Sequence, residues 1–224
     1  MILNARSVDK LESLARELHD RYEADCYILP FDVCDRKASA EALKSLPEEW
    51  SSIDILINNA GLAVGVDKEH EGNIDEWDMM IDTNIKGLLS VTRLVVPGMV
   101  ERGCGHIINI GSIAGTEPYE NGAVYCASKH AVHAISQAMR ADLLSAGIKV
   151  GEVRPGMVET EFSEVRFHGD KERAAGVYKG VEALQGEDIA EAIHWMLNLP
   201  AHVNVNDIVL MPTCQAGAYY TYRK

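Results

Sequence analysis

The sequence lacks several features that would place it among small stapled proteins, metal proteins or membrane proteins. Its five cysteines are odd in number and scattered, and none forms a C-x-x-C pair, so neither a disulfide framework nor a zinc site is indicated. No run of about 18 apolar residues would span a membrane, and no basic stretch followed by an apolar core marks a signal peptide. These absences favour a reducing, cytoplasmic setting without a metal centre.

Positive charge is also scarce. The 224 residues include 21 lysines and arginines against 34 aspartates and glutamates, a formal net charge of -13. This balance argues against nucleic acid and against an anionic membrane surface as partners. A hydrophobic content of 47% with 25% charged residues is typical of a globular chain. The length suffices for one large α/β domain over residues 1–224.

Short apolar segments alternate along the chain with amphipathic segments of ten or more residues. This alternation predicts βαβ crossovers and a doubly wound parallel sheet in a three-layer α/β/α arrangement. Strands are predicted at "CYILPFDV", "IDILINNAG", "GHIINIGS", "IKVGEVRPG" and "DIVLMP", and helices near 11–18, 36–46, 75–101, 123–146 and 187–198.

Three of these predicted strands end in small or polar residues, "NNAG", "GS" and "RPG". In an open parallel sheet, ligands bind beyond the carboxyl ends of the strands. The three segments are therefore expected to lie along one edge and to face one ligand. The charged, weakly periodic segment 159–186 follows the third of them, and so long an excursion beside a site favours a substrate lid over a plain surface loop.

Tyr125 and Lys129 lie four residues apart in a predicted helix, and residues at this spacing are neighbours on one face. A free tyrosine has a pKa of about 10 and is a poor proton shuttle at neutral pH. A nearby cation lowers the pKa of a phenol by about 1–3 units, which would make Tyr125 an effective general acid or base. The pair alone is equally typical of an exposed helix.

Three further features point to the same edge. Ser112 ends the segment "GHIINIGS", where its hydroxyl could hold a carbonyl oxygen beside Tyr125. The small residues of 58–61 would let a flat cofactor lie close to the backbone. Asn84 falls inside a predicted helix, where asparagine is a mediocre helix former, and it is a candidate to bind a water that connects Lys129 to solvent.

In their order and spacing, these residues resemble the pattern of the short-chain dehydrogenase/reductase family over residues 1 to about 165. The resemblance is carried by "NNAG" at 58–61, Asn84, Ser112, "YCASK" at 125–129 and "PGMVET" at 155–160. It implies a Rossmann-type sheet and hydride transfer between a nicotinamide and a carbonyl or alcohol carbon.

The resemblance also implies a role for each matching residue. Tyr125 would be the general acid or base, and Lys129 would lower its pKa and hold the nicotinamide ribose. Ser112 would orient the substrate oxygen, and Asn84 would anchor a relay water. The implied cofactor contacts are Asp32, Val33, Asn59, Ala60, Gly61, Tyr125, Lys129, Pro155, Gly156, Val158 and Thr160.

The first residues, "MILNARS", resemble the family's second strand and the turn after it. Members that prefer NAD usually place an acidic residue at the end of that strand, where a carboxylate binds the ribose 2′-hydroxyl. Here Ala5 is followed by Arg6, and a guanidinium suits a 2′-phosphate. NADP is therefore the expected cofactor; the alternative is that Arg6 is a solvated surface residue.

The family's glycine-rich turn, which receives the pyrophosphate at a helix N-terminus, has no counterpart here, because no G-x-x-x-G-x-G occurs. The strand that precedes this turn lies centrally in the doubly wound order, so its two neighbours would lose ladder partners. We expect an N-terminally truncated form of a longer protein, and a catalytically silent chain is one alternative function.

Longer segments resemble one branch of the family, the NADP-dependent 3-hydroxy acid dehydrogenases, which act on serine, L-allo-threonine and similar acids. They include "LPEEWSSIDILINNAGLAVG", "VETEFSEVRFHGD" and "LPAHVNVNDIVLMPTCQ". The implied reaction oxidises the 3-hydroxyl to an aldehyde or ketone, with Arg166 in the lid, or else Arg154, on the substrate carboxylate. A general carbonyl reductase is the alternative. The resemblance also implies a homotetramer.

Overall fold

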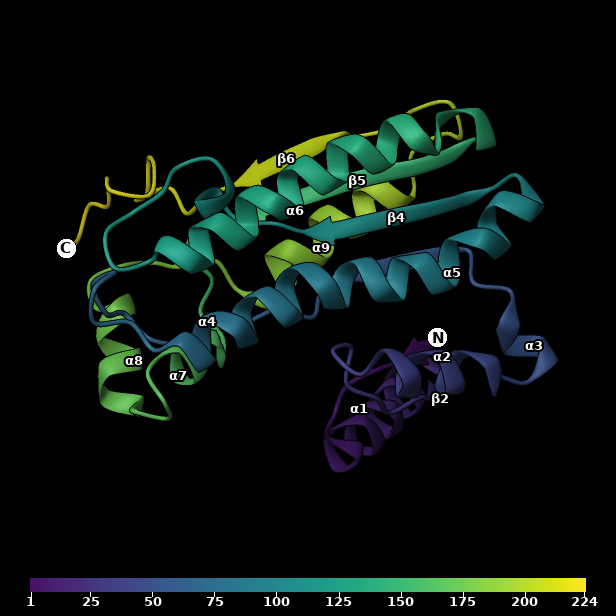
Figure 1. Cartoon of the computed structure of the whole chain (residues 1–224), viewed down its shortest axis with the longest axis horizontal. Helices are drawn as coiled ribbons and strands as arrows, with labels where there is room; N and C mark the ends of the chain where they lie inside the picture. The colour runs from purple at the N-terminus through teal and green to yellow at the C-terminus, as the bar shows by residue number, and fades with distance from the viewer.

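Six parallel strands form two ladders in a computed structural model that describes residues 1–224 (Figure 1). They are β1 (Ile2–Leu3), β2 (Tyr27–Ile28), β3 (Ile55–Asn58), β4 (Gly105–Ile110), β5 (Ile148–Pro155) and β6 (Asp207–Leu210). β1 pairs with β2, and a second ladder has the order β3-β4-β5-β6. Every pair is parallel, as the alternation of strands and helices predicted.

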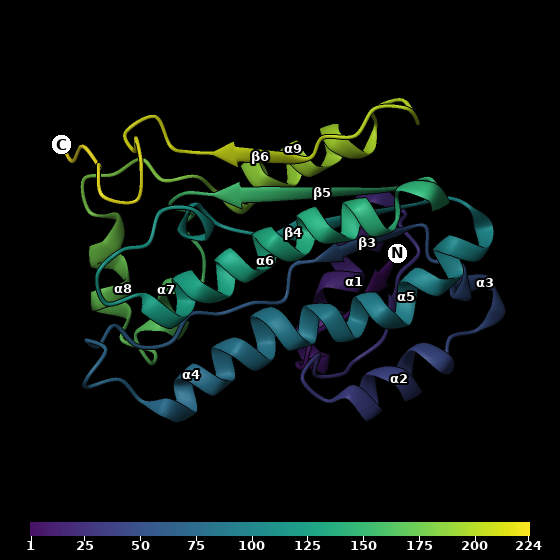
Figure 2. The same ribbon diagram turned by 45° about the horizontal axis from the view of Figure 1, so that its top comes forward.

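Nine α-helices surround these strands. They are α1 (Val8–Tyr22), α2 (Arg36–Lys44), α3 (Glu48–Ser51), α4 (Ile74–Ile81), α5 (Leu88–Arg102), α6 (Ala123–Asp142), α7 (Phe162–Arg166), α8 (Lys171–Tyr178) and α9 (Gly186–Leu197). α5 and α6 cover one face of the larger ladder and α9 covers the other (Figures 1 and 2). The three-layer α/β/α prediction is therefore confirmed. None of the helices has the length and apolar character that crossing a membrane requires.

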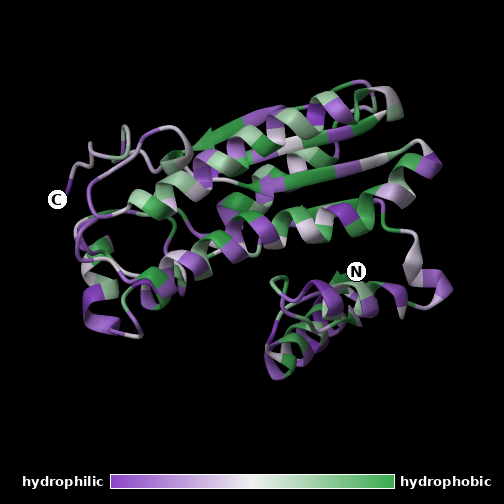
Figure 3. Ribbon diagram, in the orientation of Figure 1, coloured by the Kyte–Doolittle hydropathy of each residue, from purple (hydrophilic) through white to green (hydrophobic).

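The two central strands, β4 and β5, are buried on both faces. Ile107 and Val150 pack with Met99 under α5 and α6, and each is 0% exposed. On the opposite face, Ile108 and Val153 pack with Met196 of α9. Burying one such side chain contributes about 1.5–3 kcal/mol, so these strands hold the layers together. The covering helices α5 and α6 alternate hydrophobic and hydrophilic residues, as amphipathic helices do (Figure 3).

The two ladders are not hydrogen-bonded to each other, because β1 and β3 do not pair. Ile55 and Ile57 of β3 are 47% and 43% exposed. The β1–β2 pair is attached through Leu29 and Phe31, which belong to the same apolar cluster as Val95 of α5.

Some elements differ from the predicted ones in their extent. The single helix expected over 75–101 is divided by a π-helical turn at Asp82–Gly87. The strand expected at "CYILPFDV" is paired only at Tyr27–Ile28. Within 159–186, two short helices form, and each buries a single residue, Ser163 in α7 and Ala174 in α8. With so few buried positions, their sequences carry almost no helical periodicity.

His106 on β4 makes the stability of this core depend on pH. It is 5% exposed and its Nε2 atom has no hydrogen-bond partner. Burial, with a smaller contribution from Lys149, lowers the pKa of His106 from 6.5 to about 4. The folded state therefore binds fewer protons than the unfolded state between these two values. Consequently, the free energy of unfolding falls by about 3 kcal/mol as the pH is lowered from 6.5 to 4.

Urea unfolding of the wild type and of His106→Leu at pH 6.5 and pH 4 checks this expectation. Other groups contribute equally to both proteins, so the difference between them isolates His106. The wild type is expected to lose about 3 kcal/mol more than the variant over this interval. Equal losses would mean that His106 is solvated or finds a partner when protonated.

Candidate active site

The strand exits that the sequence singled out lie along one edge. The segments after β3, β4 and β5 leave the sheet at its carboxyl end, since the three strands are parallel and adjacent. Ser112 caps a 3₁₀ turn (Ile113–Gly115) directly after β4, and that turn packs against α6. Tyr125 lies in the first turn of α6. The structure thus brings Ser112 and Tyr125 together, as predicted.

Asn84 fixes the segment after β3 to helix α6. Its side chain is buried, accepts a hydrogen bond from the backbone N–H of Leu62 at 2.8 Å, and donates to the carbonyl of Leu62 at 2.8 Å. It also donates to Ser128 Oγ at 3.0 Å. Both amide hydrogens are therefore in use, so a relay water would meet only the remaining lone pair of Oδ1 or the main chain. The π-helical turn around Asn84 is a feature often found at functional sites.

Lys129 is buried beside these groups, with a relative exposure of 7%. Its ammonium donates to the carbonyl of Ile110, at the end of β4, over 2.8 Å. A Cβ added at Gly61 would lie 3.2 Å from Asn84 Oδ1 and 3.6 Å from Lys129 Nζ, so glycine allows this close approach. Burial lowers the pKa of Lys129 to about 8, although the carboxylate of Glu152 opposes that change.

Tyr125 does not have the lowered pKa that its spacing from Lys129 suggested. Burial, and next the neighbouring Tyr119, raise the pKa of Tyr125 well above its usual value, while a hydrogen bond with Ser112 opposes the rise. The Lys129 ammonium lies 6.0 Å from the centre of the tyrosine ring. The cation that lowers the pKa of Tyr125 is the Arg166 guanidinium, and burial outweighs its effect. In this structure, Tyr125 is therefore a neutral proton donor.

Ser112 has a hydroxyl hydrogen to offer. Its Oγ atom accepts a hydrogen bond from the backbone N–H of Ala114 at 3.1 Å, which fixes the side chain at the start of the turn. A serine hydroxyl is both a donor and an acceptor, so its O–H can still donate to an oxygen placed beside Tyr125.

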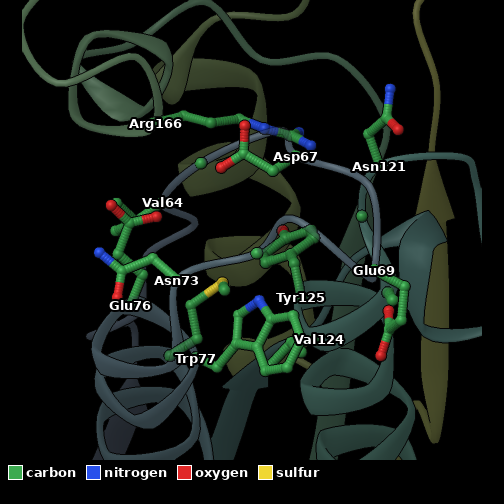
Figure 4. A pocket seen from close by; sticks show the side chains of 15 residues that line it. Val64, Asp67, Glu69, Asn73, Glu76, Trp77, Asn121, Val124, Tyr125 and Arg166 are labelled. Atoms are coloured by element: carbon green, nitrogen blue, oxygen red, sulfur yellow. The ribbon is translucent and has the colours of Figure 1, made fainter.

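A pocket opens above Tyr125, between the loop after β3, the start of α6 and the segment 159–186 (Figure 4). Arg166 enters it from α7. Its guanidinium carbon lies 6.0 Å from the ring centre of Tyr125 and 5.3 Å from that of Tyr119. One guanidinium nitrogen donates to the Tyr119 hydroxyl at 3.0 Å, while Nε is buried without a partner. Arg166 is thus held directly over the candidate acid.

The opposite sides of this pocket are acidic. Asp67, Glu69 and Glu76 line it together with Trp77 (Figure 4). Glu76 is the most buried of these carboxylates, with a side-chain exposure of 17%, and it lies 3.5 Å from Nε2 of His168. One guanidinium therefore faces three carboxylates, an arrangement suited to a small molecule that carries charges of both signs.

The segment 159–186 is joined to the pocket by backbone and side-chain contacts. The N–H of Gly65 donates to the carbonyl of Arg166 at 3.1 Å. The hydroxyl of Tyr178 donates to the carbonyl of Val158 at 2.8 Å. Lys10 of α1 reaches across to Glu161 over 2.9 Å on the surface. These contacts place the predicted lid against the rim of the pocket.

The predicted cofactor contacts follow the carboxyl ends of four strands. Arg6 follows β1, Asp32 and Val33 follow β2, the group at 59–61 follows β3, and Pro155 ends β5. Three more residues lie just beyond β5: Gly156, Val158 and Thr160. The edge that lines the pocket also carries these residues, so the structure gathers all of them on one side of the molecule.

The residues at this edge fit a nicotinamide dinucleotide phosphate. Arg6 has a side-chain exposure of 74% and only a long contact of 3.9 Å with Asp32, so its guanidinium is available to a phosphate. An ammonium has three donors, and Lys129 uses one of them on Ile110, which leaves two for ribose hydroxyls.

Arg154, the second candidate for a substrate carboxylate, is instead committed to the sheet. It is 9% exposed, donates to Asp207 of β6 at 2.7 Å and donates to Thr116 at 3.2 Å. Sequence reasoning also missed Tyr119 and Ser128, which touch Arg166 and Asn84. Both lie between Ser112 and Lys129 in the sequence. The only sequence signal for either of them was that Ser128 directly precedes Lys129.

Comparison with known proteins agrees with this geometry. The "short chain dehydrogenase" family matches residues 1–171. The NADP-dependent 3-hydroxy acid dehydrogenase YdfG of Escherichia coli (strain K12) is 48% identical over 219 residues, which are 97% of this chain and 87% of that protein. The NADP-dependent 3-hydroxy acid dehydrogenase of Schizosaccharomyces pombe is 46% identical over 100% of this chain and 86% of its own length.

Solved structures lead to the same group. A closed form of serine dehydrogenase complexed with NADP+ superposes with a TM-score of 0.92 and 46% identity, and covers 100% of this chain and 89% of its own. The serine dehydrogenase of Escherichia coli gives a TM-score of 0.82 and 44% identity, over 96% of this chain and 87% of its own. The chain belongs to the short-chain dehydrogenase family.

Proposed function

We propose that the protein is an NADP-dependent oxidoreductase that transfers a hydride between nicotinamide and the 3-hydroxyl carbon of a small 3-hydroxy acid of the serine or L-allo-threonine type. The observation that carries this proposal is the position of Arg166, whose guanidinium lies over Tyr125 in the same pocket. Two relatives at 46–48% identity are named NADP-dependent 3-hydroxy acid dehydrogenases, which supports the same substrate class.

The side chains at the edge divide the chemistry between them. In the direction of alcohol oxidation, the substrate hydroxyl lies between Ser112 and Tyr125. Tyr125 must first lose its own proton, and its phenolate oxygen then takes the proton of the substrate hydroxyl. A nicotinamide bound at this edge would supply the acceptor for the hydride of the substrate's hydroxyl-bearing carbon. In the reverse direction, neutral Tyr125 returns the proton to the carbonyl oxygen, a role that suits its raised pKa. Lys129 supplies positive charge whenever the phenol gives up its proton.

The charges around the pocket favour an amino acid among the 3-hydroxy acids. Arg166 offers a planar pair of donors to a carboxylate, and its Nε atom is buried and without a partner. The carboxylates of Asp67, Glu69 and Glu76 suit the α-ammonium group of serine. A substrate with a carboxylate alone would meet more negative than positive charge there.

Three further parts of the proposal concern the rest of the molecule. Arg6 binds the 2′-phosphate of NADP, since its guanidinium is exposed beyond β1. Residues 1–224 form a single dehydrogenase domain, and 159–186 is its substrate lid. The protein assembles as a homotetramer through α4, α5 and α6; Met79, Leu89 and Leu94 leave apolar surface on the first two of these helices.

Replacing Arg166 with leucine tests the substrate class. We expect kcat/KM for serine to fall by about 10–100-fold, because a charged hydrogen-bonded contact contributes about 1.5–3 kcal/mol. Turnover of 2-aminoethanol, which lacks the carboxylate, should change little. The measurement is the ratio of the two kcat/KM values in each protein, with NADP saturating.

Arg173→Leu is the matched control, because Arg173 lies in the same segment but stacks on Phe167, at 4.6 Å from the ring centre. It should leave the ratio unchanged. Equal losses for both substrates in Arg166→Leu would show that Arg166 is structural. Wild-type preference for bulky ketones over serine would favour a general carbonyl reductase instead.

A further inference from the structure

Glu152 is a fully buried carboxylate that the proposed reaction does not use. It lies in the middle of β5, between β4 and β6, and is 0% exposed. Placing an ionised carboxylate in such a position is costly unless it is paired and hydrogen-bonded. Its partners therefore indicate what it does.

One oxygen of Glu152 is held by a histidine that reaches the surface. His133 Nδ1 lies 2.7 Å from Glu152 Oε2, and the histidine side chain is 21% exposed. The other ring nitrogen of His133 lies 3.1 Å from Gln137 Nε2. The amide can only donate, so this contact assigns the proton of a neutral imidazole to Nδ1, where it points at the carboxylate.

The other oxygen of Glu152 lies against the end of β4. Oε1 is buried and has no hydrogen-bond partner. It lies against Gly111, where an added Cβ would collide with it. The carbonyl just before Gly111 belongs to Ile110 and accepts the hydrogen bond of 2.8 Å from Lys129 Nζ. The Lys129 ammonium and the free carboxylate oxygen therefore approach the same peptide unit at the end of β4.

The charged groups near Glu152 come from α6 and from the neighbouring positions of the sheet. Lys129 and His133 are four residues apart on α6 and thus share one face of the helix. On the sheet side, Arg154 of β5 pairs with Asp207 of β6 at 2.7 Å. Glu152 is the carboxylate that opposes the effect of burial on the pKa of Lys129. Two buried cations, Lys129 and Arg154, therefore lie near Glu152, and Arg154 is already paired with Asp207.

We propose that Glu152, held in place by His133, is a positioning residue that keeps Lys129 protonated at the active site. The proposal rests on the proposed function only in giving Lys129 a part in the reaction. It assigns a task to two residues outside the pocket, one of them on the far side of Lys129 from Tyr125. Through Glu152, the charge of Lys129 beside Tyr125 depends on His133, whose side chain reaches the surface.

The direction of each pKa agrees with this chain of contacts. Burial lowers the pKa of Lys129 to about 8, and Glu152 raises it. Burial raises the pKa of Glu152, and the hydrogen bond from His133 lowers it. His133 thus favours the ionised carboxylate, and the ionised carboxylate favours the ammonium.

Glu152→Gln tests the proposal, since it keeps the shape of the side chain and removes its charge. The pKa of Lys129 should fall by about one unit. This is measured from the NMR titration of the Lys129 side chain in protein with labelled lysine, assigned with Lys129→Arg. The alkaline limb of the pH profile of kcat/KM should move down by the same amount. Asp207→Asn removes a carboxylate that raises the pKa of Glu152, so it should not lower either value.

His133→Gln is a second variant, at a residue near the surface, and it decides the question if Glu152→Gln does not fold. It should shift the Lys129 titration in the same direction by a smaller amount, since Glu152 then ionises less readily. An unchanged titration in a folded variant overturns the proposal. The NMR titration does not depend on turnover. If the proposed substrate is wrong, the wild type will not oxidise serine, and this result is independent of the Lys129 titration.

Discussion

Tyr125→Phe is expected to lower kcat for serine oxidation by about 10²–10⁴-fold while leaving the fold intact. General acid–base catalysis contributes a factor of this size, and Tyr125 is the phenol that is hydrogen-bonded with Ser112. The ring itself packs against Phe162 at 5.7 Å between centres, a contact that phenylalanine keeps. Steady-state kinetics, with thermal unfolding to verify folding, provide the measurement.

Tyr119→Phe is the matched control, because it removes a hydroxyl from the same pocket. That hydroxyl accepts from Arg166 at 3.0 Å, so its loss should weaken substrate binding and raise KM more than it lowers kcat. Turnover that survives in Tyr125→Phe would mean that another group moves the proton. Equal loss of kcat in the two variants would mean that the pocket, and not the Tyr125 hydroxyl, had been damaged.

The layers of the fold could be predicted from the sequence because they depend on local apolar patterns. β4 includes a run of apolar residues because both of its faces are buried, with Ile107 and Ile108 at 0% exposure on opposite sides. The turn at Asp82–Gly87 could not be predicted, since α and π turns place similar residues on the buried side. Its cause, the contact of Asn84 with Leu62, joins segments 22 residues apart.

The candidate site could be predicted where it depends on a motif and not where it depends on burial. Ser112, Tyr125 and Lys129 were found from their order, but the pKa of Tyr125 was expected in the wrong direction. Spacing on a helix shows that a cation is near, yet not how much water has been removed from the phenol. The task proposed for Glu152 was hidden for a similar reason, because its register opposite Asn109 of β4 is fixed only by strand pairing.

Asn84→Ala is expected to cost about 3 kcal/mol of the free energy of unfolding and to reduce turnover as well. The substitution leaves the N–H and the carbonyl of Leu62 without their partner, and each buried unpaired group costs about 1–3 kcal/mol. For a chain of this length, the loss corresponds to a midpoint lowered by about 6–12 °C. The segment 59–61 should also move away from Lys129, since Asn84 holds it there. Calorimetry and NADPH fluorescence titration measure the two effects.

Asn73→Ala supplies the comparison, because Asn73 caps α4 at the surface through one hydrogen bond to the N–H of Asp75. Losing that cap should cost about 1 kcal/mol and should not affect NADPH binding. If Asn84→Ala is as stable as the wild type and only turnover falls, Asn84 acts through a bound water instead of through the Leu62 backbone.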